Sequence, residues 1–504
     1  MEVKIIVLAL YALTIIVLGI RGMKKTNSFS DFMLGGGNVG PWMSAFSYGT
    51  AYFSAVVFIG FAGKIGWGFG FSGVWIGVFN ALIGVLGVWW LMAWKIKQTS
   101  TRYNISTMGE YFEIRYKAKY FKLYAAIVIF IFFIPYSAAV FQGLSYLFEI
   151  SLPGVEYWQA VVGMGLFTSI YLVMGGYKSM SVIDTFFGMI MTVGVIMLAV
   201  FTINGGGGLT NIANELSAIK PKLTETVGPP GLWKLFSLIM LTSLAPFAMP
   251  QLVQKFYAIK DKRSIKIGMM ASTVFALLIG GIAYFVGSTG RLFVTTETAP
   301  HAFNEAGKPI FDMIMPELLT QIIPEYLFII ILVLILSASM STLAALVLIS
   351  SSTLTKDFYA GYINKKVSDK NLTLLTRIAS VVFIVLSVAL ALMKLDTIVA
   401  ILGVSWGAIG AAFLGPFIWG LFTDFCNKFG AYASSFIGLG LTIYLYASGW
   451  SSPEAGTIGM LVSLVLNPIA SFIADFIITT YRMKKFLNKD DEKQPKLGSY
   501  AKTK

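Results

Sequence analysis

Two adjacent hydroxyl side chains, Ser341 and Thr342, stand in the middle of an apolar stretch. Residues 326–355 carry no charged side chain, and this length is enough to cross a lipid bilayer. On a helix, Ala338, Ser341 and Thr342 fall at positions i, i+3 and i+4 and therefore share one face. Their two hydroxyls and a main-chain carbonyl offer neutral oxygen ligands, which suit a monovalent hard cation. In the alternative interpretation, each hydroxyl bonds the carbonyl four residues earlier and only bends the helix.

A second polar stretch occupies residues 44–63, which contain several hydroxyls together with Gly49, Gly60 and Gly63. If this span unwinds near residues 50–54, its free carbonyls can ligate a cation. Non-helical backbone at such depth is tolerated only where it lines a cavity or is buried in protein. The glycines are equally compatible with a close contact between two helices, so this span alone leaves both interpretations open.

Asp184 is a carboxylate at the inner end of an apolar span. An ionisable residue within a membrane span suggests function, here the guidance of a cation, although a side chain reaching to the interface explains it as well. Some aromatic and polar side chains within the spans are candidates for binding a solute, and each of them alone is also compatible with packing: Tyr52, Tyr136, Gln142, Ser243, Phe247 and Trp406.

The composition indicates a membrane protein that crosses the bilayer many times. Hydrophobic residues make up 57% of the 504 residues and charged residues only 12%, with a mean hydropathy of +0.77. A single histidine and few buried carboxylates leave little for metal-assisted or acid–base catalysis, so we expect no enzyme. The net charge of +14 resides in short loops, which favours membrane orientation over nucleic-acid binding.

The hydropathy pattern predicts an all-α membrane protein with about thirteen spans, centred near residues 12, 53, 82, 135, 166, 192, 243, 278, 338, 383, 409, 438 and 466. About 30 of the 38 Lys and Arg residues, including a loop at 255–266, fall on one side. The amino terminus is therefore expected outside and the carboxyl terminus in the cytoplasm. The first span is expected to be retained. Residues 1–483 form one predicted polytopic membrane domain, and residues 484–504 a disordered cytoplasmic tail.

Two spans with interruptions occupy matching places in the sequence. The span at 44–63 opens a block at about 42–203, and the span broken by Pro246 and Pro250 opens a block at about 233–423. Each block has about five spans, so the two start on opposite sides of the membrane. Paired interrupted helices indicate an inverted-repeat transporter with a binding site near the midplane.

Several motifs together resemble the sodium:solute symporter family over roughly residues 1–480: "FMLGGGNVGPWMSAFSYGTAYFSAVVFIGFAG", "YLVMGGYKSMSVIDTF", "PQLVQKFYAIKDKRSIKIG", "MSTLAALVLISSSTLTKDFY" and "WGAIGAAFLGP". The resemblance is to the bacterial proline and pantothenate symporters. It implies a leucine-transporter-like fold of five plus five helices, with one extra helix at the amino end and two at the carboxyl end.

The resemblance also implies particular residues. The sodium ligands would be the carbonyls of Thr50, Phe53 and Ala338 and the hydroxyls of Ser341 and Thr342. Asp184 would lie on the inner sodium path, and Ser54 and Tyr136 match positions linked to substrate or coupling. Proline carriers have an aspartate in place of Tyr52, and Trp and Tyr in place of Thr242 and Pro246, so the resemblance names no substrate.

We therefore expect a symporter of the plasma membrane that imports a small polar organic solute, of the amino acid, carboxylate or vitamin, or sugar class, by alternating access. Sodium would be the coupling ion, with no other cofactor, no nucleic acid and no obligate protein partner. The alternatives are a proton-coupled or uncoupled permease on the same fold, for which Asp184 is the titratable candidate, and a transporter-like sensor.

Overall fold

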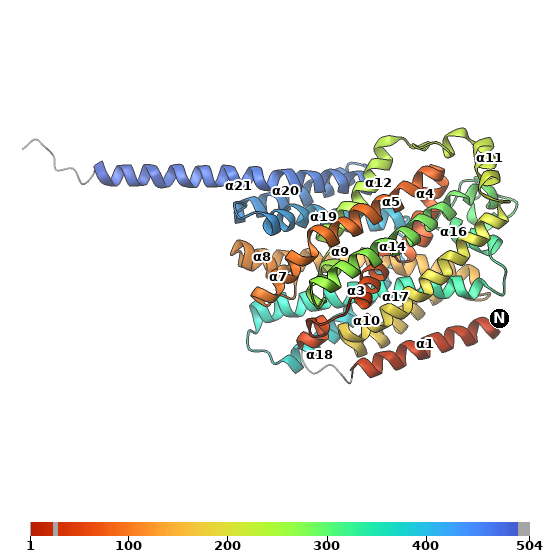
Figure 1. The fold of residues 1–504 in the computed structure, drawn as a ribbon, viewed down its shortest axis with the longest axis horizontal. Helices are drawn as coiled ribbons and strands as arrows, with labels where there is room; N and C mark the ends of the chain where they lie inside the picture. The colour runs from red at the N-terminus through yellow and green to blue at the C-terminus, as the bar shows by residue number, and fades with distance from the viewer. Residues whose placement is uncertain (1, 24–28, 492–504) are drawn as a thin grey trace, which may run out of the picture.

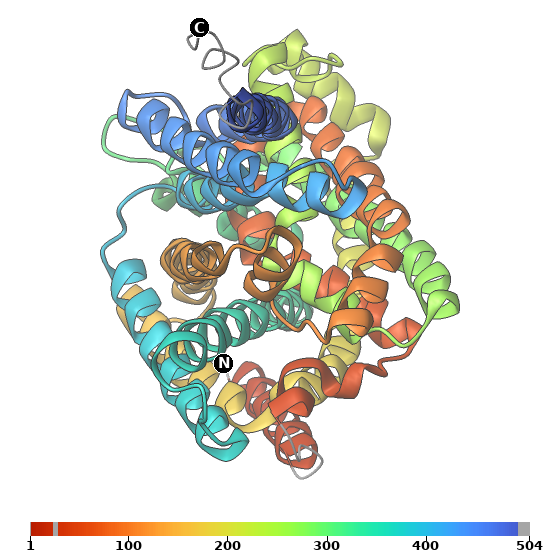
Figure 2. The same cartoon turned by 90° about the vertical axis from the view of Figure 1, so that its left-hand side faces the viewer.

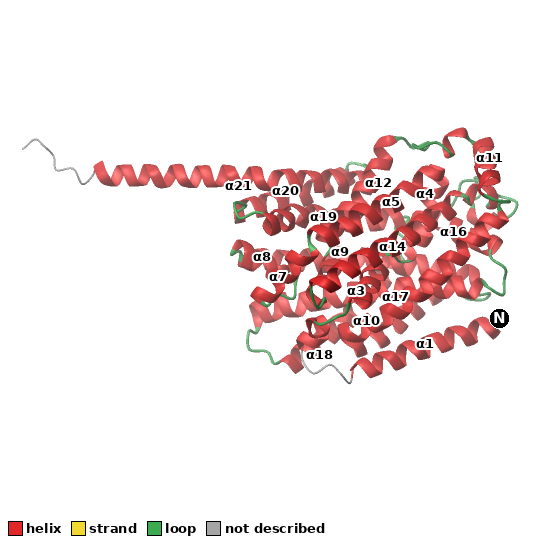
Figure 3. Ribbon diagram, in the orientation of Figure 1, coloured by secondary structure: helices red, strands yellow, loops and turns green. Residues whose placement is uncertain are grey.

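Helices form the regular structure of the chain in this computed structural model, which describes residues 2–23 and 29–491 (Figure 3). Among these residues no strand occurs, and β-bridges pair only Val39 with Ile259 and Phe303 with Pro309. Ten helices are long and apolar enough to cross a membrane, or eleven if one bent pair forms a single span. The chain is thus an all-helical protein of many apolar spans.

The α-helices are as follows: α1 Glu2–Met23, α2 Phe29–Leu34, α3 Pro41–Tyr52, α4 Ala62–Phe69, α5 Val74–Phe79, α6 Val88–Leu91, α7 Ala93–Tyr103, α8 Met108–Tyr116, α9 Lys119–Ser151, α10 Tyr157–Gly205, α11 Leu209–Ile219, α12 Leu232–Leu244, α13 Pro250–Ala258, α14 Lys262–Ser288, α15 Gly290–Phe293, α16 Phe311–Ile322, α17 Phe328–Ser352, α18 Asp369–Leu392, α19 Ile398–Phe422, α20 Lys428–Ala447 and α21 Ser452–Asp491. Three π-helical segments lie between them, η2 Val56–Phe61, η4 Asn80–Gly87 and η8 Thr353–Ile363.

Two helices form the interior of the bundle. In the most apolar windows of α17 and α19, 94% and 89% of the residues are buried, whereas only 17% are buried in α1 and in α21. Figure 2 shows α1 and α21 on opposite sides of the bundle, and in Figure 1 α21 extends well beyond the other helices. The polar stretch around Ser341 is therefore surrounded by protein, and α1 and α21 present their apolar side chains at the periphery.

The first predicted interruption is present. Helix α3 ends at Tyr52, Phe53 has extended dihedral angles (φ −102°, ψ 123°), and the chain resumes helical structure through η2 and α4. The break lies at Phe53 and Ser54 rather than at a glycine. The Ser54 hydroxyl accepts the N–H of Val56, which satisfies one of the main-chain donors left free where the helix restarts.

The second predicted interruption is also present. Helix α12 ends at Leu244, a 3₁₀ turn covers Ala245–Ala248, and α13 begins at Pro250 after a bend of 43°. Pro250 takes the first position of α13, where a missing N–H costs nothing. Pro246 lies in the 3₁₀ turn.

The glycines of residues 44–63 pack closely, as the alternative interpretation predicts. A Cβ atom added to Gly49 would lie 2.5 Å from the Phe275 ring, and one added to Gly60 would lie 2.5 Å from Ile398. The same packing continues beyond the predicted span, where a Cβ on Gly66 would lie 2.1 Å from the main chain of Gly287 on α14. The break and the close contacts are therefore both present, because they use different residues.

Some boundaries differ from those expected. The predicted spans near residues 166 and 192 are two halves of α10, separated at Gly176, which has a φ of 61° and a ψ of 178°. Two further helices, α11 and α16, lie between the predicted spans. Helix α21 continues to Asp491, into the predicted tail, and residues 492–504 lie outside the described part of the chain.

Candidate functional site

Six oxygen atoms gather where α17 crosses the break that follows α3. The Thr342 hydroxyl lies 3.3 Å from the carbonyl oxygen of Thr50, 3.2 Å from that of Ala51 and 3.2 Å from that of Ala338. The Ser341 hydroxyl lies 2.8 Å from the Thr50 hydroxyl. All of these residues are fully buried. Thr342 does bond the carbonyl four residues earlier, as the bent-helix interpretation predicts, but it also reaches two carbonyls of the broken helix.

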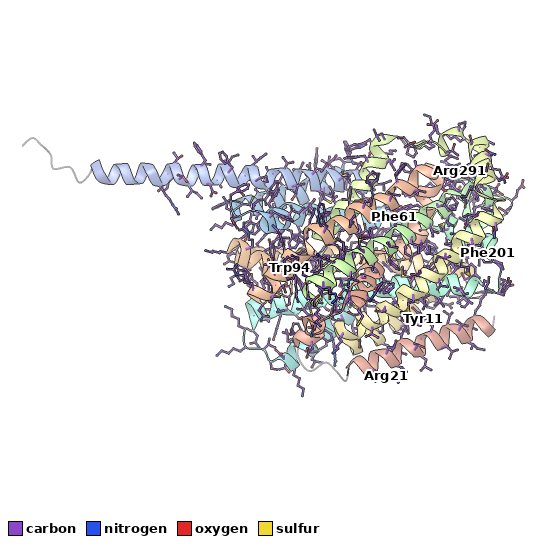
Figure 4. The ribbon with its side chains drawn as sticks, in the orientation of Figure 1. Tyr11, Arg21, Phe61, Trp94, Phe201 and Arg291 are labelled. Carbon is purple, nitrogen blue, oxygen red and sulfur yellow. The ribbon has the colours of Figure 1, made fainter. Side chains whose placement is uncertain are left out.

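The neighbouring hydroxyls of α17 tie this helix to other parts of the bundle. Ser339 accepts the N–H of Ala55 at 2.9 Å, so α17 supports the chain on both sides of the break. Ser337 bonds Tyr11 at 3.0 Å, and Tyr11 lies on the side of α1 that faces the bundle (Figure 4). The hydroxyls in this apolar helix thus serve specific contacts between helices rather than the helix alone.

The predicted ligand Phe53 lies at the break itself. Its extended conformation takes its carbonyl out of the helical pattern of α3. The side chain is completely buried and its ring packs on that of Tyr52, with centroids 4.8 Å apart. Phe53 thus follows shortly after Ala51, whose carbonyl Thr342 contacts, and its chain neighbours Tyr52 and Ser54 line a nearby cavity.

Asp184 lies inside the bundle and is completely buried. The Ser47 hydroxyl donates a hydrogen bond of 2.5 Å to its Oδ2 atom, and Ser47 precedes Thr50 by one helical turn. The same oxygen lies 3.7 Å from the ammonium of Lys255. Lys255 is only 1% exposed, so its prediction as part of a cytoplasmic loop is wrong. Helix α13 extends to Ala258 and carries this lysine into the protein interior.

A small central cavity lies beside the break. It has a volume of about 10 Å³, the room of one water molecule, and is therefore too small for an amino acid in this conformation. Trp406 stands edge-on to the rings of Tyr52 and Tyr136, each with centroids 5.8 Å away. The cavity is lined by Tyr52, Ser54, Val56, Val57, Phe61, Asn80, Tyr136, Thr242, Tyr284, Leu402 and Trp406. None of these side chains is charged.

Asn80 is a cavity residue that the sequence analysis missed. Its Oδ1 atom accepts the hydroxyl of Thr242 at 2.7 Å and that of Ser243 at 3.1 Å. The Tyr52 hydroxyl donates to the Thr242 carbonyl at 2.5 Å, which joins the two broken helices directly. Asn80 could have been found as an amide in the middle of an apolar span, where a polar side chain needs a partner or a function.

Three of the predicted solute residues do not line the cavity. Ser243 lies behind the lining, where its hydroxyl bonds Asn80. Phe247 is outside the cavity lining, against Gly87. Gln142 belongs to a separate cluster, where its Nε2 atom donates to the Asp312 carboxylate and to the Asp396 carbonyl, each at 3.1 Å. The Asp312 Oδ2 atom also accepts the N–H of Ile398 at 3.0 Å, which caps the start of α19.

The Asp312 carboxyl has a pKa above the ordinary value of an aspartate. Its pKa is raised to about 6, mainly by burial and to a lesser degree by the nearby Asp396 carboxylate, while the N–H of Ile398 and the Lys64 ammonium favour the ionised form and limit the rise. Asp312 Oδ1 and Gln142 Oε1 are both buried without a hydrogen-bond partner among the described residues. A proton on Asp312 Oδ1 would turn this unpartnered acceptor into a donor.

Two broken helices, packed around buried oxygens and next to an uncharged cavity, are typical of secondary transporters with a leucine-transporter-like fold. Solved structures support this fold. One of a Na⁺-coupled sialic acid symporter in a substrate-bound outward-open state gives a TM-score of 0.79 at 18% identity, covering 93% of this chain and 97% of that one. Mhp1, a nucleobase-cation-symport-1 family transporter, gives a TM-score of 0.55 at 12% identity, covering 90% of this chain and 96% of that one.

The chain belongs to the sodium:solute symporter family, whose sequence profile matches residues 32–438. It is 27% identical to the osmoregulated proline transporter OpuE of Bacillus subtilis, with 95% of each chain covered. It is 28% identical to a sodium/proline symporter of Staphylococcus aureus, with 95% of this chain and 93% of that protein covered. The protein is thus a sodium-coupled solute symporter, and its family is one of transporters rather than of enzymes.

Proposed function

We propose that sodium binds between the broken helix and α17, coordinated by the carbonyls of Thr50, Phe53 and Ala338 and the hydroxyls of Ser341 and Thr342. The observation that carries this proposal is the position of the Thr342 hydroxyl among carbonyls from both helices. Neutral oxygens suffice for a monovalent ion, whose desolvation costs less than that of a divalent one. A sodium ion there would replace hydrogen bonds between hydroxyls by direct ligand contacts.

Sodium at this position stabilises the contact between the broken helix and α17, and thereby orders Phe53 and Ser54 beside the solute cavity. A ligand can shift the equilibrium between outward and inward states only through its different affinities for them. The coupling is reciprocal, so solute raises the affinity for sodium as sodium raises the affinity for solute. The membrane potential adds about 2.3 kcal/mol per charge per 100 mV to inward sodium movement.

The transport unit has about thirteen spans in the plasma membrane, with the amino terminus outside. Two inverted repeats, at about 42–203 and 233–423, each begin with a broken helix and rock against one another. The interrupted α3–α4 and α12–α13 segments support this assignment. In this arrangement Asp184 and Lys255 lie on the cytoplasmic side of the sodium site, and the Asp312 cluster lies on the outer side.

The solute is a small molecule without net charge, because no charged side chain lines the cavity. A zwitterion such as an amino acid fits best, since the relatives named above include proline carriers. The aromatic side chains of Tyr52, Tyr136 and Trp406 would hold its apolar body, and Asn80, Ser54 and Ser243 would hydrogen-bond its polar groups. The cavity must expand before it can admit such a molecule.

A thermal-shift screen of the purified protein tests this function. The panel contains L-proline, other amino acids, pantothenate and sugars, each measured in sodium chloride and in choline chloride at equal ionic strength. We expect a neutral or zwitterionic hit whose stabilisation requires sodium, and uptake of that hit into vesicles should require a sodium gradient. A hit that binds equally in choline, and is taken up with a proton gradient alone, would contradict sodium coupling.

A further inference from the structure

A buried ion pair closes the cytoplasmic side of the proposed sodium site. The Lys255 ammonium donates a hydrogen bond of 2.8 Å to the Ser47 hydroxyl and lies 3.7 Å from Asp184 Oδ2. The side chains are 1% and 0% exposed. The ammonium also lies 5.0 Å from the centre of the Tyr177 ring. A lysine and an aspartate this deeply buried stay charged only as a pair, because each alone would lose its hydration without compensation.

The ion pair is joined directly to the sodium site. Ser47 donates to the Asp184 carboxylate and is one helical turn from Thr50 on α3. Thr50 in turn contacts Ser341 through its hydroxyl and Thr342 through its carbonyl. Any cation among these oxygens therefore lies close to both members of the pair.

Asp184 has one carboxylate oxygen available for a second cation. Oδ2 is occupied by Ser47 and Lys255, whereas Oδ1 is buried and has no hydrogen-bond partner among the described residues. Buried carboxylate oxygens are normally satisfied, so an unpartnered one next to a cation pathway indicates a ligand that comes and goes.

We propose that Lys255 is a built-in substitute cation, which neutralises Asp184 when sodium is absent and competes with sodium for this carboxylate. The inference rests on the proposed sodium site and extends it. As sodium enters from its site toward Asp184 Oδ1, the attraction between Asp184 and Lys255 weakens and the ammonium shifts away. When sodium leaves to the cytoplasm, Lys255 returns to the carboxylate.

With Lys255 in this role, the empty and the sodium-loaded carrier each move a defined net charge across the membrane. Without sodium, Asp184 and Lys255 sum to zero, so the empty carrier returns as a neutral unit. With sodium the sum is +1, and the loaded step moves charge. In Lys255→Met, the empty carrier holds an uncompensated carboxylate and the loaded carrier is neutral, so the voltage dependence shifts from the loaded step to the return step.

Sodium titration of the purified protein, followed by intrinsic tryptophan fluorescence against choline chloride at constant ionic strength, tests the proposal. We expect Lys255→Met to raise the apparent sodium affinity at least about tenfold, since the competitor is gone. The matched control is Lys260→Met, which removes the same charge from an exposed position just beyond α13 and should change the affinity less than about twofold. An unchanged or weaker affinity in Lys255→Met would overturn the proposal.

The Asp184→Asn background separates competition from simple charge repulsion. There, Lys255→Met should change sodium affinity less than about threefold, because no carboxylate remains to be shared. An equal effect in both backgrounds would show that the lysine acts only through its field, contrary to the proposal. The double variant, Asp184→Asn with Lys255→Met, has no unpaired buried charge. It can therefore be measured even if Lys255→Met alone fails to fold.

A measurement on the unmodified protein gives an independent test. If Lys255 keeps Asp184 ionised, sodium binding in weakly buffered solution releases no proton. Release of about one proton per sodium ion would mean that Asp184 is protonated, or Lys255 gives up its proton, and would contradict the proposal. The sodium site itself is tested separately: loss of sodium binding in Thr342→Ala, together with a wild-type response in Lys255→Met, would refute only the role of the lysine.

Discussion

The hydroxyl oxygens of Thr50 and Ser341 lie 2.8 Å apart, although 291 positions separate the two residues in the sequence. This contact joins α3, which ends at the break, to α17, the most deeply buried of the candidate spans among the described residues. Both hydroxyls lie beside the carbonyls that Thr342 contacts. The proposed ion site therefore lies within the contact between α3 and α17, so ion binding directly affects how these two helices pack.

Replacing Ser341 by alanine removes one proposed ligand without changing the fold of α17. We expect the sodium concentration for half-maximal fluorescence change to rise about tenfold, which corresponds to about 1.4 kcal/mol. Ser352→Ala is the matched control on the same helix, because within the described part of the chain the Ser352 hydroxyl bonds only the Ile349 carbonyl. A Ser341→Ala protein that titrates like Ser352→Ala would remove Ser341 from the ligand set.

The contact between Tyr52 and Thr242 joins the two broken helices and is expected to act on solute rather than on sodium. Tyr52→Phe keeps the ring against Trp406 and loses only the hydroxyl that bonds the Thr242 carbonyl. We expect weaker binding of the solute found by the thermal-shift screen, by about five- to tenfold, since one buried hydrogen bond contributes about 1 kcal/mol. Sodium binding without solute should change less than twofold. The opposite pattern would place Tyr52 in the ion site.

Much of this architecture was predictable, because hydropathy and prolines act locally. The apolar spans follow from composition, and the bend at Pro246 and Pro250 from the geometry of proline. The break at Phe53 was predicted in its region but not at its residue, since it depends on Ser339 of a distant helix, which accepts the N–H of Ala55. No local pattern contains that contact.

The position of Lys255 shows where charge counting fails. A lysine at the end of an apolar span normally marks a cytoplasmic loop. Here it is buried, because Asp184 and Ser47 from two other helices compensate its charge. Asn80 was missed for a similar reason, as its partners Thr242 and Ser243 lie on a different broken helix. Partners distant in sequence decide both cases, and they become visible only in the folded chain.

Asp312 is expected to make the stability of the purified protein depend on pH. Because its pKa is raised from 3.8 to about 6, it contributes stability that is complete below about pH 4 and is lost as the pH rises through about 6. The loss in the free energy of unfolding over this pH range is on the order of 3 kcal/mol. Asp312→Asn imitates the protonated form, because its amide carries no charge at any pH in this range. The variant should therefore be more stable than the wild type at pH 7.5 and match it near pH 4.5.

Thermal unfolding in detergent across this pH range is the measurement. Glu317 has a pKa that burial raises as well, so only the difference between wild type and Asp312→Asn isolates Asp312. A difference that stays constant from pH 4.5 to 7.5 would mean that Asp312 does not titrate there.

The contact between Gly287 on α14 and the main chain of α4 should not tolerate a methyl group. A Cβ atom at Gly287 would lie 2.0 Å from the Ala62 carbonyl oxygen, so we expect Gly287→Ala to lower stability by about 1–3 kcal/mol. Gly281→Ala on the same helix meets nothing within 4 Å and should be neutral or slightly stabilising. Equal thermal stability of the two variants would show that these helices do not pack as closely as described.

The most direct test of the central claim is equilibrium binding of radioactive sodium to the purified protein with and without Thr342. Thr342 is the residue whose hydroxyl reaches the carbonyls of both α3 and α17. We expect wild type and Ser352→Ala to bind sodium with similar affinity, and Thr342→Ala to bind it at least about tenfold more weakly while remaining folded. Sodium binding by Thr342→Ala with wild-type affinity would contradict the proposed site.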